Sequence, residues 1–180
     1  MSSQRALLGR KALILLVLQT AKSLTGRTKL QKILYLSNMC ASNVIPDYKY
    51  YNYGPYSEMV SMEIENMRNN GWLEERSSKT QNDNVAYTYW LSRNGNEITN
   101  SLASKFDEKT VKNTIELVES LNSLSTDELE IMATLVFLRE ENKTLPDNEL
   151  AREVSRLKPR FTEKQAKECL RIFNLLKYYR

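Results

Sequence analysis

The chain has 180 residues and a net charge of +4, and its length allows one ordinary domain or two very small ones. A hydrophobic fraction of 41% is typical of a globular protein. This composition excludes general disorder, and the longest apolar run, residues 12–18, is much shorter than the roughly 20 residues of a membrane-spanning helix. The sequence has no histidine, which excludes Ser-His and Cys-His nucleophile pairs and histidine metal ligands, and it has no glycine-rich phosphate loop. We therefore expect a non-enzymatic protein with no metal and no cofactor.

The first half of the chain predicts a winged helix. Apolar spacing and turn residues predict, in chain order, helices at residues 4–24 and 28–41, a strand at 48–53, a helix at 58–70, and a hairpin with strands at 72–76 and 85–91. Gly54-Pro55 indicates a turn, and Ser57 indicates an N-cap for the third helix. In a winged helix the third helix enters a DNA groove and the tip of the hairpin reaches the DNA backbone.

The second half of the chain is predicted to be helical. A first helix is expected after Ser92–Gly95. Four more are expected at residues 108–121, 125–141, 148–157 and 162–177. Ser125 to Glu128 has the pattern of a capping box. The predicted fold is mainly α with a small β-hairpin wing: a winged helix-turn-helix domain over residues 1–102 and a C-terminal helical bundle over residues 103–180. The last three helices also have the proportions of a second recognition unit.

Charge is unevenly distributed along the chain and indicates a surface for a polyanion, although an ordinary solvated surface explains it equally well. No acidic residue precedes Asp47, residues 116–149 are acidic, and the chain is basic again from Arg152. Side chains of the types that contact phosphates occur near the second and third helices, in the wing and on the last helix. These candidates for DNA binding are Arg27, Lys29, Lys32, Tyr56, Ser57, Arg68, Lys79, Lys164, Lys167 and Arg171.

The third helix argues against DNA binding because it is acidic. It contains Glu58, Glu63 and Glu65, with Arg68 as its only basic residue. Carboxylates that face a DNA groove meet phosphates and have few bases from which they can accept a hydrogen bond. An acidic third helix is more typical of a surface for a protein partner or for solvent.

Tyrosines gather just before the third helix. Aromatic side chains of this kind anchor protein interfaces, although they also stack on single-stranded bases or pack internally. The candidates for partner binding are Tyr51, Tyr53, Tyr56 and Glu58.

The two cysteines, Cys40 and Cys169, have no CxxC spacing and form neither a disulfide framework nor a zinc site in our interpretation. We expect both to be small buried residues of helices. A reducing compartment, the cytoplasm, fits this usage.

Three stretches resemble the YwgA family of bacterial and archaeal proteins: residues 26–35 (GRTKLQKILY), 51–57 (YNYGPYS) and 157–162 (LKPRFT). The first two together are also similar, more distantly, to the Panacea domain of antitoxins. The resemblance implies a helix-turn-helix or winged-helix protein, and its Panacea part implies a role in neutralising a toxin or presenting it to other machinery. Neither family supplies catalytic residues.

The sequence thus leads to two hypotheses and a remote third. The first is a non-enzymatic winged-helix regulator that binds DNA, with a homodimer as its expected form. The alternative is an antitoxin-like or adaptor module that binds a protein partner, such as a toxin or a regulator. A nucleic-acid-processing enzyme is the third.

Overall fold

The computed structural model describes residues 3–80 and 83–176 of the chain. These residues form eight helices and five strands. In chain order the elements are α1 (Ser3–Ala21), β1 (Leu24–Thr25), α2 (Arg27–Asn38), β2 (Lys49–Tyr51), β3 (Gly54–Tyr56), α3 (Glu58–Asn69), β4 (Leu73–Lys79), β5 (Val85–Leu91), α4 (Arg93–Ala103), α5 (Glu108–Asn122), α6 (Thr126–Glu141), α7 (Asp147–Leu157) and α8 (Glu163–Leu175). The predicted mainly α fold with a small β-hairpin wing is confirmed.

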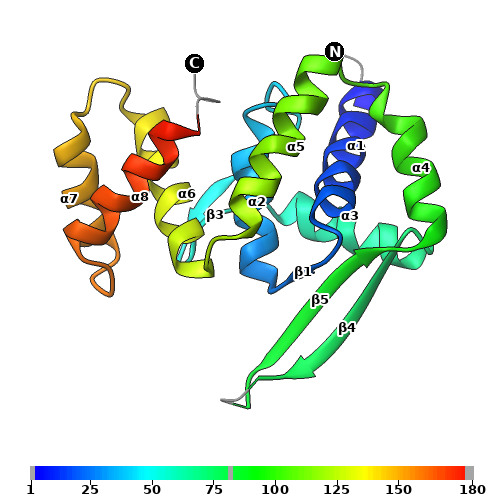
Figure 1. Ribbon diagram of the computed structural model, residues 1–180, viewed down its shortest axis with the longest axis horizontal. Coiled ribbons are helices and arrows are strands. Elements are labelled where there is room, and N and C mark those ends of the chain that lie inside the picture. Colours follow the sequence, from blue (N-terminus) through cyan, green and yellow to red (C-terminus); the bar gives the residue numbers. More distant parts are fainter. Residues whose placement is uncertain (1–2, 81–82, 177–180) are drawn as a thin grey trace.

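Helix α1 is a central helix, and α2, α4, α5 and β5 pack around it (Figure 1). Its residues 12–18 are all buried, because an apolar run that covers every side of a helix has to be enclosed on every side. The predicted helix at 4–24 ends early, at Ala21. Lys22 takes a left-handed conformation with φ 62°, and Leu24 and Thr25 leave the helix to form β1.

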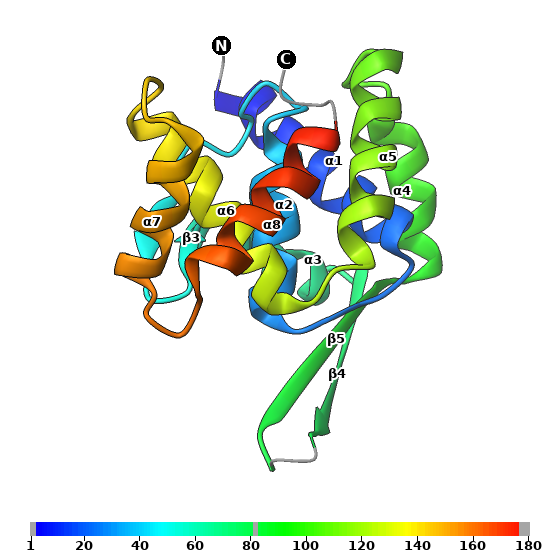
Figure 2. The ribbon, with the colours of Figure 1, turned by 60° about the vertical axis from the view of Figure 1, so that its left-hand side comes forward.

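The wing is an antiparallel sheet with the strand order β1-β5-β4. Strands β4 and β5 pair from Leu73 opposite Leu91 to Lys79 opposite Val85, and Thr25 of β1 lies opposite Thr88 of β5. The hairpin projects from the helical body in both views (Figures 1 and 2). Residues 81 and 82, within the predicted bend at its tip, lie outside the described residues.

The predicted strand at 48–53 is confirmed only over Lys49–Tyr51, where β2 lies. Residues 49–56 form a separate hairpin, in which β2 pairs with β3, and the strand beside the wing is β1. The turn falls at Asn52 and Tyr53 instead of Gly54-Pro55. Gly54 belongs to β3 with φ 82°, and a Cβ atom there would lie 3.1 Å from the Thr134 hydroxyl oxygen of α6. Close packing of the hairpin on α6 therefore decides where the chain turns.

The later helices have the predicted order, and their N-caps follow the sequence. The hydroxyl of Ser125 accepts from the backbone N–H of Glu128 and forms a capping box for α6, and Thr162 does the same with Gln165 for α8. The predicted end of the last helix, at residue 177, lies outside the described residues. No helix among residues 3–80 and 83–176 is long and apolar enough to cross a membrane.

One hydrophobic core runs through both halves of the chain. Helix α5 packs against α1 and α2, α6 packs against α2, and α7 and α8 pack against α6 and each other. Buried residues from before and after position 102 belong to the same cluster, such as Leu13 and Leu34 with Leu117 and Leu135. The predicted division at residue 102 stays a prediction. Of the two free cysteines, Cys169 is buried in this core as predicted and Cys40 is half-buried.

Candidate functional site

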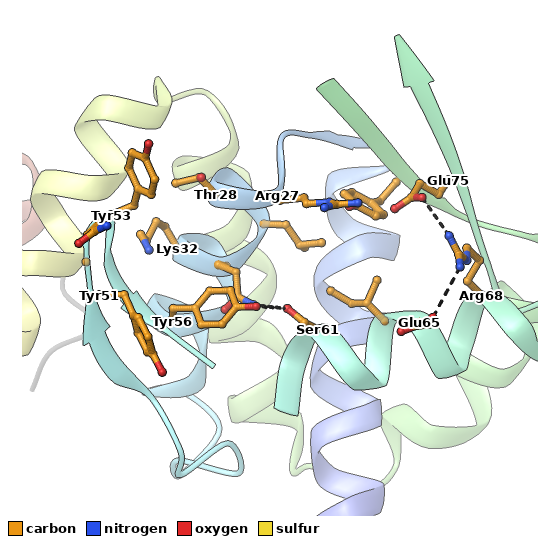
Figure 3. A pocket seen from close by; sticks show the side chains of 16 residues that line it. Arg27, Thr28, Lys32, Tyr51, Tyr53, Tyr56, Ser61, Glu65, Arg68 and Glu75 are labelled. Carbon is orange, nitrogen blue, oxygen red and sulfur yellow. Dashed lines mark hydrogen bonds and ion pairs between the residues drawn. The ribbon is translucent and has the colours of Figure 1, made fainter. Parts of the chain in front are cut away.

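A cleft of about 550 Å³ lies between the β2–β3 hairpin, the start of α2, the side of α3 and the base of the wing. Figure 3 shows the tyrosines of the hairpin at one end of this cleft and the charged pairs of α3 and β4 at the other. The cleft brings together six of the side chains that the sequence singled out, namely Arg27, Lys32, Tyr51, Tyr53, Tyr56 and Arg68. Its volume falls within the range of known ligand-binding sites.

The hairpin end of the cleft is aromatic and exposed. The side chains of Tyr51 and Tyr53 are 45% and 61% exposed, which is unusual for large rings. Tyr51 meets the ring of Tyr56 edge-on at 5.5 Å between centroids, and the Tyr56 hydroxyl lies 2.9 Å from the Ser61 hydroxyl (Figure 3). Tyr56 is therefore held in place, while Tyr53 at the turn is open to a partner.

The wing end of the cleft is charged but internally balanced. Arg68 of α3 forms ion pairs with Glu75 of β4, at 3.1 Å, and with Glu65, at 3.9 Å (Figure 3). Both carboxylates of this end therefore share one guanidinium. Arg68 was predicted to contact DNA, and these pairs occupy it within the protein.

Arg27 lies between these two ends, at the start of α2 (Figure 3). Its guanidinium carbon is 3.8 Å from the centre of the Tyr87 ring, and its Nε donates to the Tyr89 hydroxyl at 3.3 Å. Burial raises the pKa of Tyr89 to about 12, so this hydroxyl keeps its proton at neutral pH. Within the described residues, no carboxylate lies within ion-pair distance of Arg27.

Both lysines of α2 bind backbone carbonyls of the protein itself, and the burial of Lys32 corrects its prediction as a DNA contact. Lys32 is 1% exposed, and its Nζ donates to the carbonyl of Pro55 at 2.7 Å. Burial lowers the pKa of Lys32 to about 8. Lys29 donates to the carbonyls of Asn122 and Leu124, at 2.7 and 3.0 Å. Helix α2 packs against β3, α5 and α6, so the side of the helix that carries these lysines is covered.

Ser57 is also buried, so it is unavailable to DNA. Its hydroxyl accepts from the Val60 N–H as the predicted N-cap and donates to Asp47 at 2.6 Å. Asp47 also accepts from the Met59 N–H, at 3.3 Å. A carboxylate of the protein itself therefore occupies the N-terminus of α3, where a phosphate would otherwise bind.

The remaining predicted site residues lie outside the cleft. Lys79 of the wing pairs with Asp83 at 2.9 Å, and on α8 Lys167 pairs with Glu163 and Arg171 with Glu168, at 2.6 and 2.7 Å. Lys164 is exposed on α8, which does not line the cleft. Glu58 is exposed at the start of α3, 3.5 Å from the hydroxyl of Tyr51.

A buried ionic cluster of Glu130, Lys158 and Arg160 contacts the turn of the β2–β3 hairpin. The sequence did not indicate this cluster. Lys158, in the loop between α7 and α8, pairs with Glu130 of α6 at 2.8 Å and donates to the carbonyl of Asn52, also at 2.8 Å. Arg160 binds the other carboxylate oxygen of Glu130 at 2.6 Å. Glu130 is 1% exposed, yet in the sequence it resembles any acidic residue of a solvated helix face.

The three stretches that carry the family resemblance meet at this cluster. Gln31 of α2 exchanges two hydrogen bonds with the backbone of Ser57, and Lys32 binds the hairpin at Pro55. Lys158 and Arg160 of the third stretch bind Glu130, and Lys158 also binds the carbonyl of Asn52 in the hairpin turn. Much of each motif therefore builds and anchors the β2–β3 hairpin.

The cleft also contains side chains that the sequence did not single out, chiefly Glu75 and Tyr89. Tyr87 and Tyr89 are two positions apart in a predicted strand and therefore share a face, which was the only available signal. The described residues contain no group of three or more acidic or cysteine side chains that could hold a metal ion.

Comparison with known proteins identifies a full-length relative. No profile of a known protein family matches the chain. The uncharacterised protein YwgA of Bacillus subtilis (strain 168) is 28% identical over 173 residues, which is 95% of this chain and 98% of YwgA. The similarity extends over all three motif stretches, while the resemblance to the Panacea domain stays a prediction. This chain is therefore similar to YwgA over nearly its whole length, which agrees with the predicted resemblance to the YwgA family.

Proposed function

We propose that this protein is a non-enzymatic protein-binding module and that the cleft beside the β2–β3 hairpin holds a segment of its partner. The observation that carries this proposal is the exposure of Tyr51 and Tyr53 on the rim of a 550 Å³ cleft. Tyrosine is enriched among the residues that dominate protein interfaces, because a large ring contributes contact area at little cost in entropy. The anchored hairpin presents these rings in a fixed position.

The charge of the surrounding face favours a protein partner over DNA. Once the buried Glu63 is set aside, Arg27, α3 and the wing present four cations and five carboxylates, a net charge of −1; they are Arg27, Arg68, Arg76 and Lys79 against Glu58, Glu65, Glu74, Glu75 and Asp83. Glu63 is neutralised separately by Arg10 and Lys11, both at 3.9 Å. A face without net positive charge gains little from the counterion release that drives non-specific DNA binding.

The protein-binding proposal is tested by placing a photo-crosslinking benzophenone amino acid at position 53 in cells that produce the protein. We expect one defined protein to be crosslinked from position 53 and not from the exposed control position 148 on α7. With that partner purified, Tyr53→Ala should weaken binding by about 2 kcal/mol, roughly 30-fold, if the ring is an anchor. Unchanged affinity of Tyr53→Ala and Tyr51→Ala would contradict the proposal.

A DNA-binding regulator is the second candidate, and the topology favours it. Helices α1 to α3 with a β1-β5-β4 sheet have the element order of a winged helix, a fold in which many proteins bind DNA. Fold alone does not establish this function. Fluorescence anisotropy with duplex DNA, including the gene's own upstream region, separates the two candidates: sequence-dependent binding that persists at physiological salt would favour the regulator.

A further inference from the structure

We propose that Arg27 is a receptor for a single carboxylate, so that the segment bound in the cleft is an acidic peptide whose Asp or Glu side chain pairs with this guanidinium. This inference rests on the proposed protein-binding function and specifies the chemistry of the partner.

Arg27 is held by neighbours that leave part of its guanidinium open. The ring of Tyr87 supports one face of the guanidinium, 3.8 Å from its central carbon, and the Tyr89 hydroxyl accepts from Nε. Both neighbours are uncharged, so the positive charge of Arg27 is not cancelled by the contacts that orient it. Among the described hydrogen bonds of this side chain, none involves the two terminal nitrogens. A planar guanidinium in this state can bind both oxygens of a carboxylate.

The carboxylates nearest to the cleft are already paired with another residue. Glu65 and Glu75 both bind Arg68, which therefore cannot serve an incoming anion without breaking these pairs. Lys32 is occupied by the Pro55 carbonyl and lies close to the buried Glu130. Of the cations that line the cleft, Arg27 is thus the one that can accept a new carboxylate.

The surroundings favour one isolated negative charge over a chain of phosphates. A nucleic acid that placed a phosphate on Arg27 would also pass its neighbouring phosphates along Glu65 and Glu75 at the wing end of the cleft. A peptide carries its carboxylate singly and can place apolar side chains against Tyr51 and Tyr53 at the other end. The exposed rings and the open guanidinium therefore fit one peptide segment together.

The test uses a positional-scanning library of fluorescein-labelled heptapeptides and the full-length protein. We expect the best binders to require Asp or Glu at one position, and the Asn or Gln version of each to bind at least 10-fold more weakly. Arg27→Ala and Arg27→Gln should bind the acidic and amide versions equally, and circular dichroism should show both variants folded. Arg152→Ala, which removes an exposed arginine of α7, is the matched control and should keep the 10-fold preference.

The outcomes separate this inference from the proposed function. Equal affinity of acidic and amide peptides for the unmodified protein would overturn the role of Arg27, while tyrosine-dependent binding of those peptides would leave the proposed function standing. Library peptides that do not bind at all would also overturn the inference. The crosslinking experiment at position 53 would then test the proposed protein-binding function independently. Duplex DNA that displaces a bound acidic peptide at physiological salt would assign the guanidinium to phosphate instead.

Discussion

At the scale of single residues, the lysines and arginines of this protein differ in what surrounds them. Some, such as Lys32 and Lys158, are buried and bind backbone carbonyls. Others, such as Arg68 and Lys79, are paired with carboxylates of the same chain. Arg27 is stacked and oriented by two uncharged tyrosines. Among the cations that line the cleft, Arg27 is the one that offers a partner an electrostatic contact without breaking an existing ion pair or carbonyl contact.

Lys32 leads to a prediction on the pH dependence of stability. Its pKa in the folded protein is about 8, below the usual 10.5. Below pH 8 the lysine is protonated in both states, and burial of the charge opposes folding to its full extent. Between pH 8 and 10.5 the folded protein releases this proton before the unfolded chain does, so stability rises with pH through this window, by about 3 kcal/mol for a shift of this size.

Comparison with Lys32→Met isolates this effect, because the titration of every other group is shared by the two proteins. Urea denaturation at pH 7, 8, 9 and 10 should show the free energy of unfolding of the natural protein rising relative to that of Lys32→Met. Parallel pH profiles of the two proteins would show that the pKa of Lys32 is not lowered.

At the scale of elements, the β2–β3 hairpin is too short to be stable by itself, and its position depends on contacts from three other parts of the chain. Gln31 and Lys32 of α2 hold one side of it, α6 packs against Gly54, and Lys158 binds the turn carbonyl of Asn52. The exposed tyrosines therefore remain ordered only while these supports are intact.

The ionic support of the hairpin can be tested by removing one partner. Lys158→Met leaves the carboxylate of Glu130, 1% exposed, with fewer compensating charges and should lower stability by about 3–5 kcal/mol. The double variant Lys158→Met, Glu130→Met should recover part of this loss, since it leaves no unpaired carboxylate. Thermal and urea denaturation measure both, and a double variant that is no more stable than the single one would refute this account.

Close packing between the wing and α4 can be tested at one residue, Gly95. A Cβ atom at Gly95 would lie 1.9 Å from the backbone oxygen of Trp72, so the backbone would have to move. We expect Gly95→Ala to destabilise the protein by about 2–3 kcal/mol, although alanine favours helices. Asn94→Ala, at an exposed position of the same turn, is the control and should change stability by less than about 0.5 kcal/mol.

At the scale of the whole molecule, the helices after residue 102 complete the core of the first half. Helix α5 covers α1 and α2, and α6 covers α2 and β3. Loss of these helices would expose α2 on the side that carries Lys29 and Lys32, together with a large part of α1. We therefore expect the cleft and its support to unfold together, as one cooperative structure that spans the predicted boundary.

A truncated chain tests this cooperativity directly. Residues 1–102 alone should lack a cooperative thermal transition and should expose apolar surface that binds the dye ANS, because Leu117, Val118 and Leu121 no longer cover their partners. The full chain should unfold in one transition by both circular dichroism and tryptophan fluorescence. A folded fragment 1–102 with a sharp transition of its own would establish the predicted two-domain division.

Local patterns in the sequence determined the order of the helices, the wing and the caps at Ser57 and Ser125, because apolar periodicity and capping residues act within a few positions of the chain. Three short motifs indicated the similarity to YwgA. The tertiary structure alone decided that Lys29 and Lys32 are occupied, that the tyrosine strand is a hairpin, and that Arg27 faces Tyr87 and Tyr89. The partners of these lysines and of Arg27 come from distant parts of the chain: Lys32 and Pro55 are 23 positions apart, and Lys29 and Asn122 are 93 positions apart. Charge and residue type are visible in a sequence, but the partner that neutralises a side chain, or fails to, is brought to it only when the chain folds.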